Sequence, residues 1–243
     1  MNLIFDIGNT QTKAAIYKND KELFTESIPA LTVSYIRNLI ERFGPPERVI
    51  LSSVSKEDSG IAEFLKTNTG YFIQLDERTL LPFQNLYETK NSLGKDRLAA
   101  IAGACNIFPG ANVLVIDAGT AITFDFINDN NEFLGGNISP GLRMRFNALH
   151  NFTSKLPLLE PAESVELFGR NTNAAIISGI ENGMIYEIEG CISGFRKKFP
   201  DLKVIFTGGD AIFFDKMLKS SIFVISNLVT LGLNRILNYN AEN

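Results

Sequence analysis

The chain has no tryptophan, one histidine and only two cysteines among its 243 residues. Cys105 and Cys191 lack Cys-x-x-Cys spacing, and His150 alone cannot complete a zinc site with them, so we expect reduced thiols and no structural metal. No apolar run is long enough to cross a bilayer, and the first residues lack the basic start of a signal peptide. These absences predict a soluble, cytoplasmic protein with no membrane partner.

An excess of positive charge is also missing. Lys and Arg number 23 against 27 Asp and Glu, which gives a net charge of −4. Since no basic run could follow a phosphate backbone, nucleic acid is not expected as a partner. The hydrophobic content of 45% is enough to bury one large core or two modest ones.

What the chain does contain is a repeat. An apolar, β-branched run ends in Asp-x-Gly followed by Thr at residues 3–10, and the same pattern returns at residues 114–120. Each copy predicts a buried strand and then a tight turn, where backbone amides and a carboxylate are exposed together. Amides in such a turn bind phosphate and a carboxylate binds a cation. One such turn is common for structural reasons alone, but two in register indicate a duplicated nucleotide-binding fold.

A second element of the repeat supports this interpretation. Residues 46–54 and 200–210 both predict a strand, a polar turn and then a helix. We therefore expect an α/β protein of two halves, residues 1–110 and 111–243, that meet at a cleft.

Sequence periodicity predicts the other elements. Strands are expected at 12–18, 21–24, 49–54, 122–127 and 132–138, and helices at 33–42, 60–67, 142–149, 172–199, 211–218 and 229–239. Residues 98–105 predict a small apolar helix that begins near 94–97. The stretch from Tyr71 to Leu93 predicts a long connection, and a connection of this length usually has a functional reason.

Polar clusters at strand ends and helix starts carry the candidate chemistry. They occupy residues 6–13, 94–97, 117–120 and 207–210, and glycine-containing motifs follow at 135–141 and 169–172. In order and spacing these motifs resemble the signature set of type III pantothenate kinases over nearly the whole chain. That family belongs to the acetate kinase, sugar kinase, heat-shock ATPase and actin superfamily.

The resemblance implies a duplicated ribonuclease H-like (actin-like ATPase) fold, with two mixed-sheet halves around a nucleotide cleft. It also implies ATP-dependent phosphorylation of pantothenate to 4'-phosphopantothenate, the first step of coenzyme A biosynthesis. The family is dimeric, so a homodimer with the active site near the subunit interface is expected.

By the same resemblance, individual residues take roles. ATP would contact Asp6, Ile7, Gly8, Asn9, Thr10, Gln11, Thr12 and Lys13 of the first loop and Thr120 of the second. Pantothenate would contact Tyr87, Gly94, Lys95, Asp96, Arg97 and Thr172, with Asp96 as the catalytic base. Asp117 would hold a monovalent cation, K⁺ or NH₄⁺, and Asp6 would hold the Mg²⁺ that accompanies ATP.

Three other functions remain open. Another kinase of the superfamily would keep both turns but use a different acceptor pocket, which residues 94–97 argue against. A nucleotide-gated binding protein would use ATP without an acceptor, although 243 residues leave little room for the insertions such proteins carry. An inactive homologue could act in gene regulation, but Asp6, Asp96, Asp117 and Thr120 are all intact.

Two positions leave local questions. Lys13 suits a phosphate contact and a solvated strand lysine equally well. Lys90 stands where relatives often carry a proline between the tyrosine and the Gly-x-Asp-Arg motif, so a stiff turn near the pocket is lost.

Overall fold

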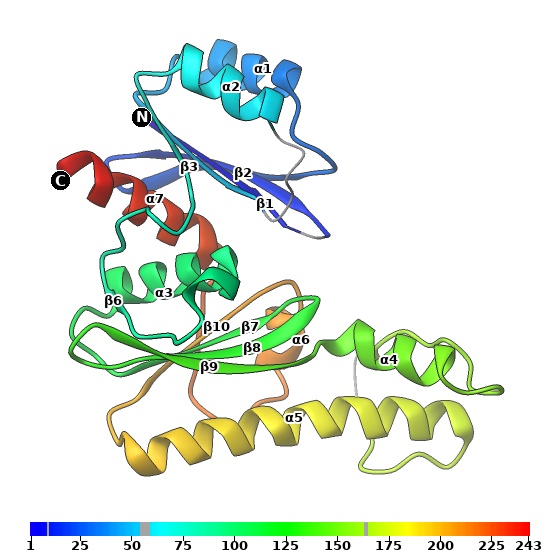
Figure 1. Cartoon of the computed structure of the whole chain (residues 1–243). Helices are drawn as coiled ribbons and strands as arrows, with labels where there is room; N and C mark the ends of the chain where they lie inside the picture. Colours follow the sequence, from blue (N-terminus) through cyan, green and yellow to red (C-terminus); the bar gives the residue numbers. More distant parts are fainter. Residues whose placement is uncertain (9, 54–58, 163–164) are drawn as a thin grey trace. The chain divides into compact units, whose positions relative to one another are not determined.

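The computed structural model describes residues 1–8, 10–53, 59–162 and 165–243 (Figure 1). Two compact units make up the chain. The first contains Met1–Pro109, Asn131–Phe133 and Asn227–Asn243, and the second contains Gly110–Asn130 and Leu134–Ser226. Asn9, a predicted ATP contact, and Val54, the predicted end of a strand, lie outside the described residues.

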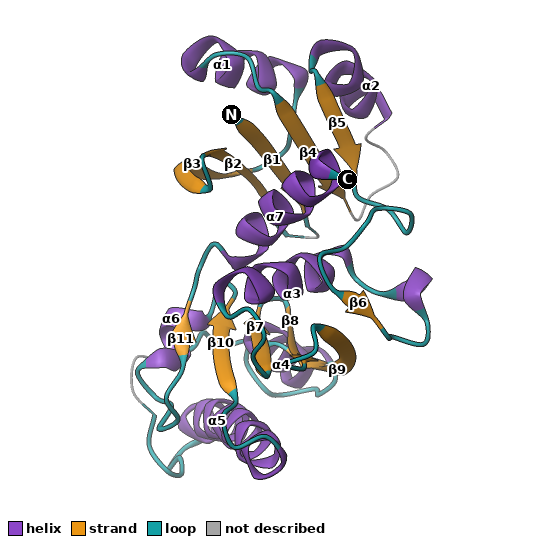
Figure 2. Cartoon of the chain, turned by 90° about the vertical axis from the view of Figure 1, so that its left-hand side faces the viewer, coloured by secondary structure: helices purple, strands orange, loops and turns teal. Residues whose placement is uncertain are grey.

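The first unit is built on a five-stranded mixed sheet. Its strands are β1 (Asn2–Ile7), β2 (Thr12–Lys18), β3 (Lys21–Ile28), β4 (Arg48–Ser53) and β5 (Tyr71–Gln74), in the order β3-β2-β1-β4-β5. β1 runs antiparallel to β2 and parallel to β4. Because the central strands are apolar on both faces, each face needs a helical cover. Helices α1 (Val33–Phe43) and α2 (Ser59–Asn68) cover one face, and α7 (Leu228–Glu242) packs on the other (Figure 2).

The second unit repeats this topology. Its strands are β7 (Val113–Ala118), β8 (Ala121–Ile127), β9 (Glu132–Pro140), β10 (Lys203–Thr207) and β11 (Phe223–Val224), in the order β11-β10-β7-β8-β9. β7 runs antiparallel to β8 and parallel to β10, as β1 does with β2 and β4. The helices of this unit are α4 (Leu142–Asn151), α5 (Thr172–Lys198) and α6 (Ala211–Asp215). The matching strand order confirms the duplication predicted from the two Asp-x-Gly turns.

The segment between β5 and the end of the first unit carries smaller elements. It contains β6 (Gln84–Asn85), the 3₁₀ helix η1 (Lys90–Ser92) and α3 (Lys95–Ile107). β6 pairs in parallel with Glu132 and Phe133, the start of β9. α3 packs along α7, and a β-carbon added to Gly103 of α3 would lie 2.6 Å from the Leu228 carbonyl oxygen. Small residues therefore let the two helix backbones approach closely.

Most predicted elements are confirmed within one to three residues. The expected connection over residues 71–93 is wrong in part, because Tyr71–Gln74 forms the edge strand β5 and pairs in parallel with β4. α6 ends at Asp215, three residues earlier than expected. No helix in the described part of the chain is both long and apolar enough to cross a membrane.

Candidate active site

The first predicted phosphate loop joins β1 to β2. The Gly8 amide donates to the Gln11 carbonyl oxygen at 3.0 Å, which closes the turn. A β-carbon on Gly8 would lie 3.1 Å from that same oxygen, so a larger residue would press against the turn. Thr10 and Gln11 are exposed, whereas Thr12 is buried at the start of β2. Thr10 and Gln11 are therefore open to solvent, while Thr12 and the Gly8–Gln11 hydrogen bond hold the loop in place.

Asp6 lies beside this loop in a polar cluster. In register, Asp6 stands opposite Lys13 on β2 and opposite Ser52 on β4. Burial raises the pKa of the Asp6 carboxyl, a hydrogen bond with the Ser52 side chain opposes the shift, and the nearby Asp96 carboxylate raises the pKa further. The Lys13 ammonium lowers it, so Lys13 acts electrostatically on Asp6. The raised pKa therefore reflects burial and the neighbouring Asp96 carboxylate.

Asp96 stands in the first turn of α3. Its Oδ1 accepts a hydrogen bond from the Arg97 amide at 2.8 Å, and the residue is exposed. A β-carbon on Gly94 would lie 2.3 Å from Oδ1, so the carboxylate takes this position because residue 94 is glycine. Lys95 turns toward β4, where its Nζ donates to the Ser53 carbonyl oxygen at 3.0 Å.

Two of the predicted pantothenate contacts lie against each other. The Arg97 guanidinium carbon is 5.4 Å from the centre of the Tyr87 ring, and the Tyr87 ring stacks on Phe133 at 6.0 Å with 12° between the ring planes. The Tyr87 amide donates to Asn85 Oδ1 at 3.0 Å, which fixes the backbone before the ring. A buried guanidinium held on an aromatic face is well oriented to bind an oxyanion.

In the second unit, Asp117 lies among backbone groups of three glycine motifs. A β-carbon on Gly119 would lie 3.2 Å from Asp117 Oδ1, and one on Gly208, whose φ is +97°, would lie 2.5 Å from it. A β-carbon on Gly141 would lie 2.4 Å from the carbonyl oxygens of Gly119 and Thr120. The Asp117–Thr120 turn, Gly141 and the 207–210 segment therefore lie close together.

Thr172 is the first residue of α5. Its neighbour Asn171 caps the helix, since Asn171 Oδ1 accepts from the Ala174 amide at 2.9 Å. A β-carbon on Gly169 would lie 2.0 Å from the Ala175 amide nitrogen, so the chain folds tightly onto the helix start. Thr172 itself is exposed.

The sequence prediction missed Ser52 and Phe133. Ser52 is buried and bonds to Asp6, and Phe133 supports the Tyr87 ring. Two serines at the carboxyl end of an apolar strand were a usable signal for Ser52, because parallel strands place such ends together. No sequence signal indicated Phe133, which reaches Tyr87 only through the pairing of β6 with the start of β9.

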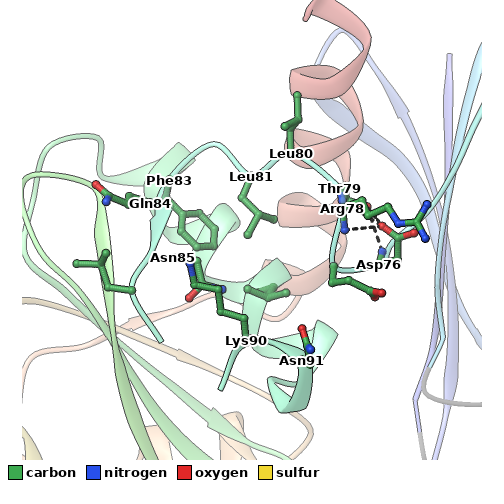
Figure 3. A pocket seen from close by; sticks show the side chains of 13 residues that line it. Asp76, Arg78, Thr79, Leu80, Leu81, Phe83, Gln84, Asn85, Lys90 and Asn91 are labelled. Atoms are coloured by element: carbon green, nitrogen blue, oxygen red, sulfur yellow. Dashed lines mark hydrogen bonds between the residues drawn. The ribbon is translucent and has the colours of Figure 1, made fainter. Parts of the chain in front are cut away.

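A separate hollow of about 470 Å³ opens in the first unit (Figure 3). Leu81, Phe83 and Leu98 form apolar walls, and Lys90 and Asn91 of η1 stand at its side. The Asp76 side chain caps the local turn, because its Oδ1 accepts hydrogen bonds from the Arg78 and Thr79 amides. Among the described residues, none predicted to contact ATP or pantothenate lines this hollow.

Comparison with known proteins places the chain among kinases. A family model described as type III pantothenate kinase matches residues 2–194. The chain is 45% identical over 243 residues to the type III pantothenate kinase of Christiangramia forsetii, and 45% identical over 242 residues to that of Phocaeicola vulgatus, with 99% of each chain covered in both cases.

Solved structures share the fold. A Campylobacter jejuni protein described as a Baf family transcriptional activator matches with a TM-score of 0.65 and 26% identity, over 99% of this chain and 100% of that one. A Sinorhizobium meliloti protein described as a 2-dehydro-3-deoxygalactonokinase matches with a TM-score of 0.62 and 12% identity, over 100% of this chain and 98% of that one. The likeness to sugar kinases confirms the duplicated ribonuclease H-like fold.

Proposed function

The chain belongs to the type III pantothenate kinase family and phosphorylates pantothenate with ATP in coenzyme A biosynthesis, and we propose that Asp96 is the base of this reaction. The observation that supports Asp96 is its place in the first turn of α3, where Oδ1 is held by the Arg97 amide and the residue is exposed. In a loose phosphoryl-transfer transition state the alcohol becomes acidic only as its bond to phosphorus forms. Asp96 would therefore orient the hydroxyl and accept its proton late.

For ATP we propose two sets of contacts. The described residues of the loop from Asp6 to Lys13, together with Asn9, would bind phosphate oxygens through backbone amides, and Thr120 of the second unit would provide a further contact. The closed turn at Gly8 and the convergence of backbone groups at Gly119 support this assignment. Lys13 would add positive charge, since it already acts on the Asp6 carboxylate.

The family implies ATP with a divalent metal ion, and we propose Asp6 as its protein contact. Mg²⁺ keeps several waters and needs few carboxylates in a nucleotide site. This requirement fits Asp6, a carboxylate near the end of β1 that stands opposite Ser52 of β4. When bound, the ion would neutralise charge on the ATP phosphates.

For the monovalent cation, K⁺ or NH₄⁺, we propose Asp117. Potassium prefers oxygen ligands, and this carboxylate lies beside the turn that also carries the Gly119 and Thr120 carbonyl oxygens. Its fit thus comes from the donor set: one negative side chain with several neutral backbone oxygens nearby. The cation would supply positive charge beside the second loop.

For pantothenate we propose Tyr87, the residues from Gly94 to Arg97, and Thr172. The stacked pair of Arg97 and Tyr87 supports the first part of this assignment, because it presents a buried cation and a phenol together. Thr172 lies in the other unit, and in a dimeric family it would serve a site near the subunit interface.

We also propose a homodimer formed through the second unit. Several large apolar side chains of this unit are exposed, with Phe152 at 89%, Leu167 at 73% and Phe168 at 64%. Exposed apolar residues that lie together mark interaction sites, and Leu167 and Phe168 are adjacent in the chain.

For the chain as a whole, we propose that the duplicated halves are residues 1–110 and 111–243, as the repeat of the Asp-x-Gly turns indicates.

The proposed site is tested by following ADP release by the purified protein with Mg-ATP and potassium, with and without pantothenate. Turnover that requires pantothenate and is lost in Asp96→Asn supports both the acceptor and the base. Turnover that survives in Asp96→Asn overturns the assignment of Asp96 while leaving the activity of the family in place.

A further inference from the structure

Lys95 links the start of α3 to the end of β4. Its Nζ donates to the Ser53 carbonyl oxygen at 3.0 Å, and the contact is partly buried. Lys95 is the first residue of α3, and Ser53 is the last residue of β4. The contact joins two elements whose residues stand 42 positions apart in the sequence.

Both ends of this link adjoin groups of the proposed active site. Asp96 follows Lys95 directly. At the other end, Ser53 pairs with Ile7 and Ser52 pairs with Asp6, at the point where β1 enters the phosphate loop. The contact therefore connects the turn that carries the base with the strand that carries the phosphate loop.

In the described part of the chain, the start of α3 has no side-chain hydrogen bond from its N-cap. That N-cap is Gly94, and Asp96 itself supplies the contact with the Arg97 amide. A helix start without a capping side chain frays readily. A second attachment at residue 95 would restrain the turn without using the carboxylate.

We propose that Lys95 is a positioning residue, whose ammonium holds the first turn of α3 on the carboxyl end of β4 and so fixes the Asp96 carboxylate relative to the phosphate loop. The contact with pantothenate proposed above for residue 95 would then come from its backbone, because its ammonium is bound to the Ser53 carbonyl oxygen. The positioning role rests on the proposed function of Asp96 as base. A displacement of about 1 Å can lower a rate by about a hundredfold, so loss of the single Lys95–Ser53 hydrogen bond can lower kcat measurably.

The first test compares Lys95→Met with Lys95→Arg. Methionine keeps the unbranched stem but cannot donate, whereas arginine keeps a donor. Lys66→Met on the exposed end of α2 is the matched control, because it removes the same charge from the same unit. We expect Lys95→Met to lower kcat by about 10- to 100-fold, with KM for pantothenate and ATP within about twofold. Lys95→Arg should recover most of the loss, and Lys66→Met should leave kcat unchanged.

The second test repeats Lys95→Met in an Asp96→Asn background. If Lys95 acts through Asp96, its loss costs little once the carboxylate is gone, and the two effects on kcat are strongly non-additive. An undiminished cost in that background would overturn the proposal, because Lys95 would then contact a phosphate or the substrate directly. A tenfold rise in KM for pantothenate with unchanged kcat would overturn it as well.

These outcomes distinguish the positioning role of Lys95 from the role of Asp96 as base, on which it rests. If Asp96→Asn alone retains full activity, the assignment of the base fails, and the proposal fails with it. If Asp96→Asn is inactive but Lys95→Met behaves like Lys66→Met, Asp96 remains the proposed base and only the positioning role of Lys95 is wrong. A large loss of thermal stability in Lys95→Met that arginine does not restore would also contradict a positioning role.

Discussion

Gly232 of α7 lies so close to Ala99 of α3 that a β-carbon on residue 232 would stand 1.7 Å from the Ala99 carbonyl oxygen. No side chain fits this contact without separating the two helices. Because α3 begins with residues proposed to bind pantothenate, its packing on α7 also helps to hold these residues in place.

We therefore expect Gly232→Ala to destabilise the protein by about 2–3 kcal/mol, which corresponds to a fall in Tm of about 5–10 °C. The reason is forced separation of two backbones that cannot relax through a flexible side chain. Gly60→Ala on α2 is the control, since a β-carbon there meets nothing within 4 Å. Equal melting temperatures for the two variants, measured by circular dichroism, would contradict the packing described.

Gly94→Ala should damage catalysis and leave folding nearly intact. The added β-carbon would lie 2.3 Å from Asp96 Oδ1, so the carboxylate must leave its bond with the Arg97 amide. We expect kcat to fall by about 10- to 100-fold while Tm stays close to that of Gly60→Ala. Steady-state kinetics checks this expectation, and an unchanged kcat would show that the position of the carboxylate is unimportant.

Glu181 of α5 gives a prediction about pH and stability. It is fully buried, its Oε1 accepts from the Ala162 amide at 2.8 Å, and within the described residues its Oε2 has no hydrogen-bond partner. Burial raises the pKa of this carboxyl above the ordinary 4.5, so the folded state holds the proton longer than the unfolded state. Stability from this group is present below that ordinary pKa and is lost as pH rises through the raised one.

Glu181→Gln should remove that dependence, because the amide stays neutral. Relative to the unmodified protein, the variant should gain stability as pH rises from about 4.5 toward neutrality, as measured by urea unfolding at pH 5 and pH 7.5. A difference between the two proteins that is the same at both pH values would show that Glu181 titrates normally.

Replacement of potassium by sodium at constant ionic strength tests the proposed cation site. We expect turnover to fall in sodium and Asp117→Asn to be nearly inactive in either salt, because the only charged oxygen ligand proposed has been removed. Asp129→Asn, in the exposed turn after β8, is the control for loss of one negative charge. Full activity of Asp117→Asn in sodium would refute the site.

The paired Asp-x-Gly turns allowed the central strands and the duplication to be predicted, because a buried apolar run followed by a polar turn has few alternatives. α7 illustrates what could not be predicted. Its periodicity identified a helix, but its packing partner is decided by the contact of Gly232 with Ala99, between residues far apart in the sequence.

The candidate site shows the same limit. Asp6, Asp96 and Asp117 were found through motifs, but the role of Ser52 depends on the register of β1 with β4. β6 has only two residues, and its existence depends on Glu132 and Phe133. A strand this short leaves no periodicity, so Phe133 could not be connected with Tyr87 in advance.

The central claim, that the Asp96 carboxylate receives the proton from pantothenate, is tested most directly by Asp96→Asn, which keeps the size of the side chain. Turnover to phosphorylated pantothenate and the affinity for Mg-ATP should be measured on the same preparation. We predict a loss in kcat of at least about 100-fold with ATP affinity within about twofold. Retention of kcat within about threefold of the unmodified enzyme, with ATP affinity unchanged, would contradict the assignment.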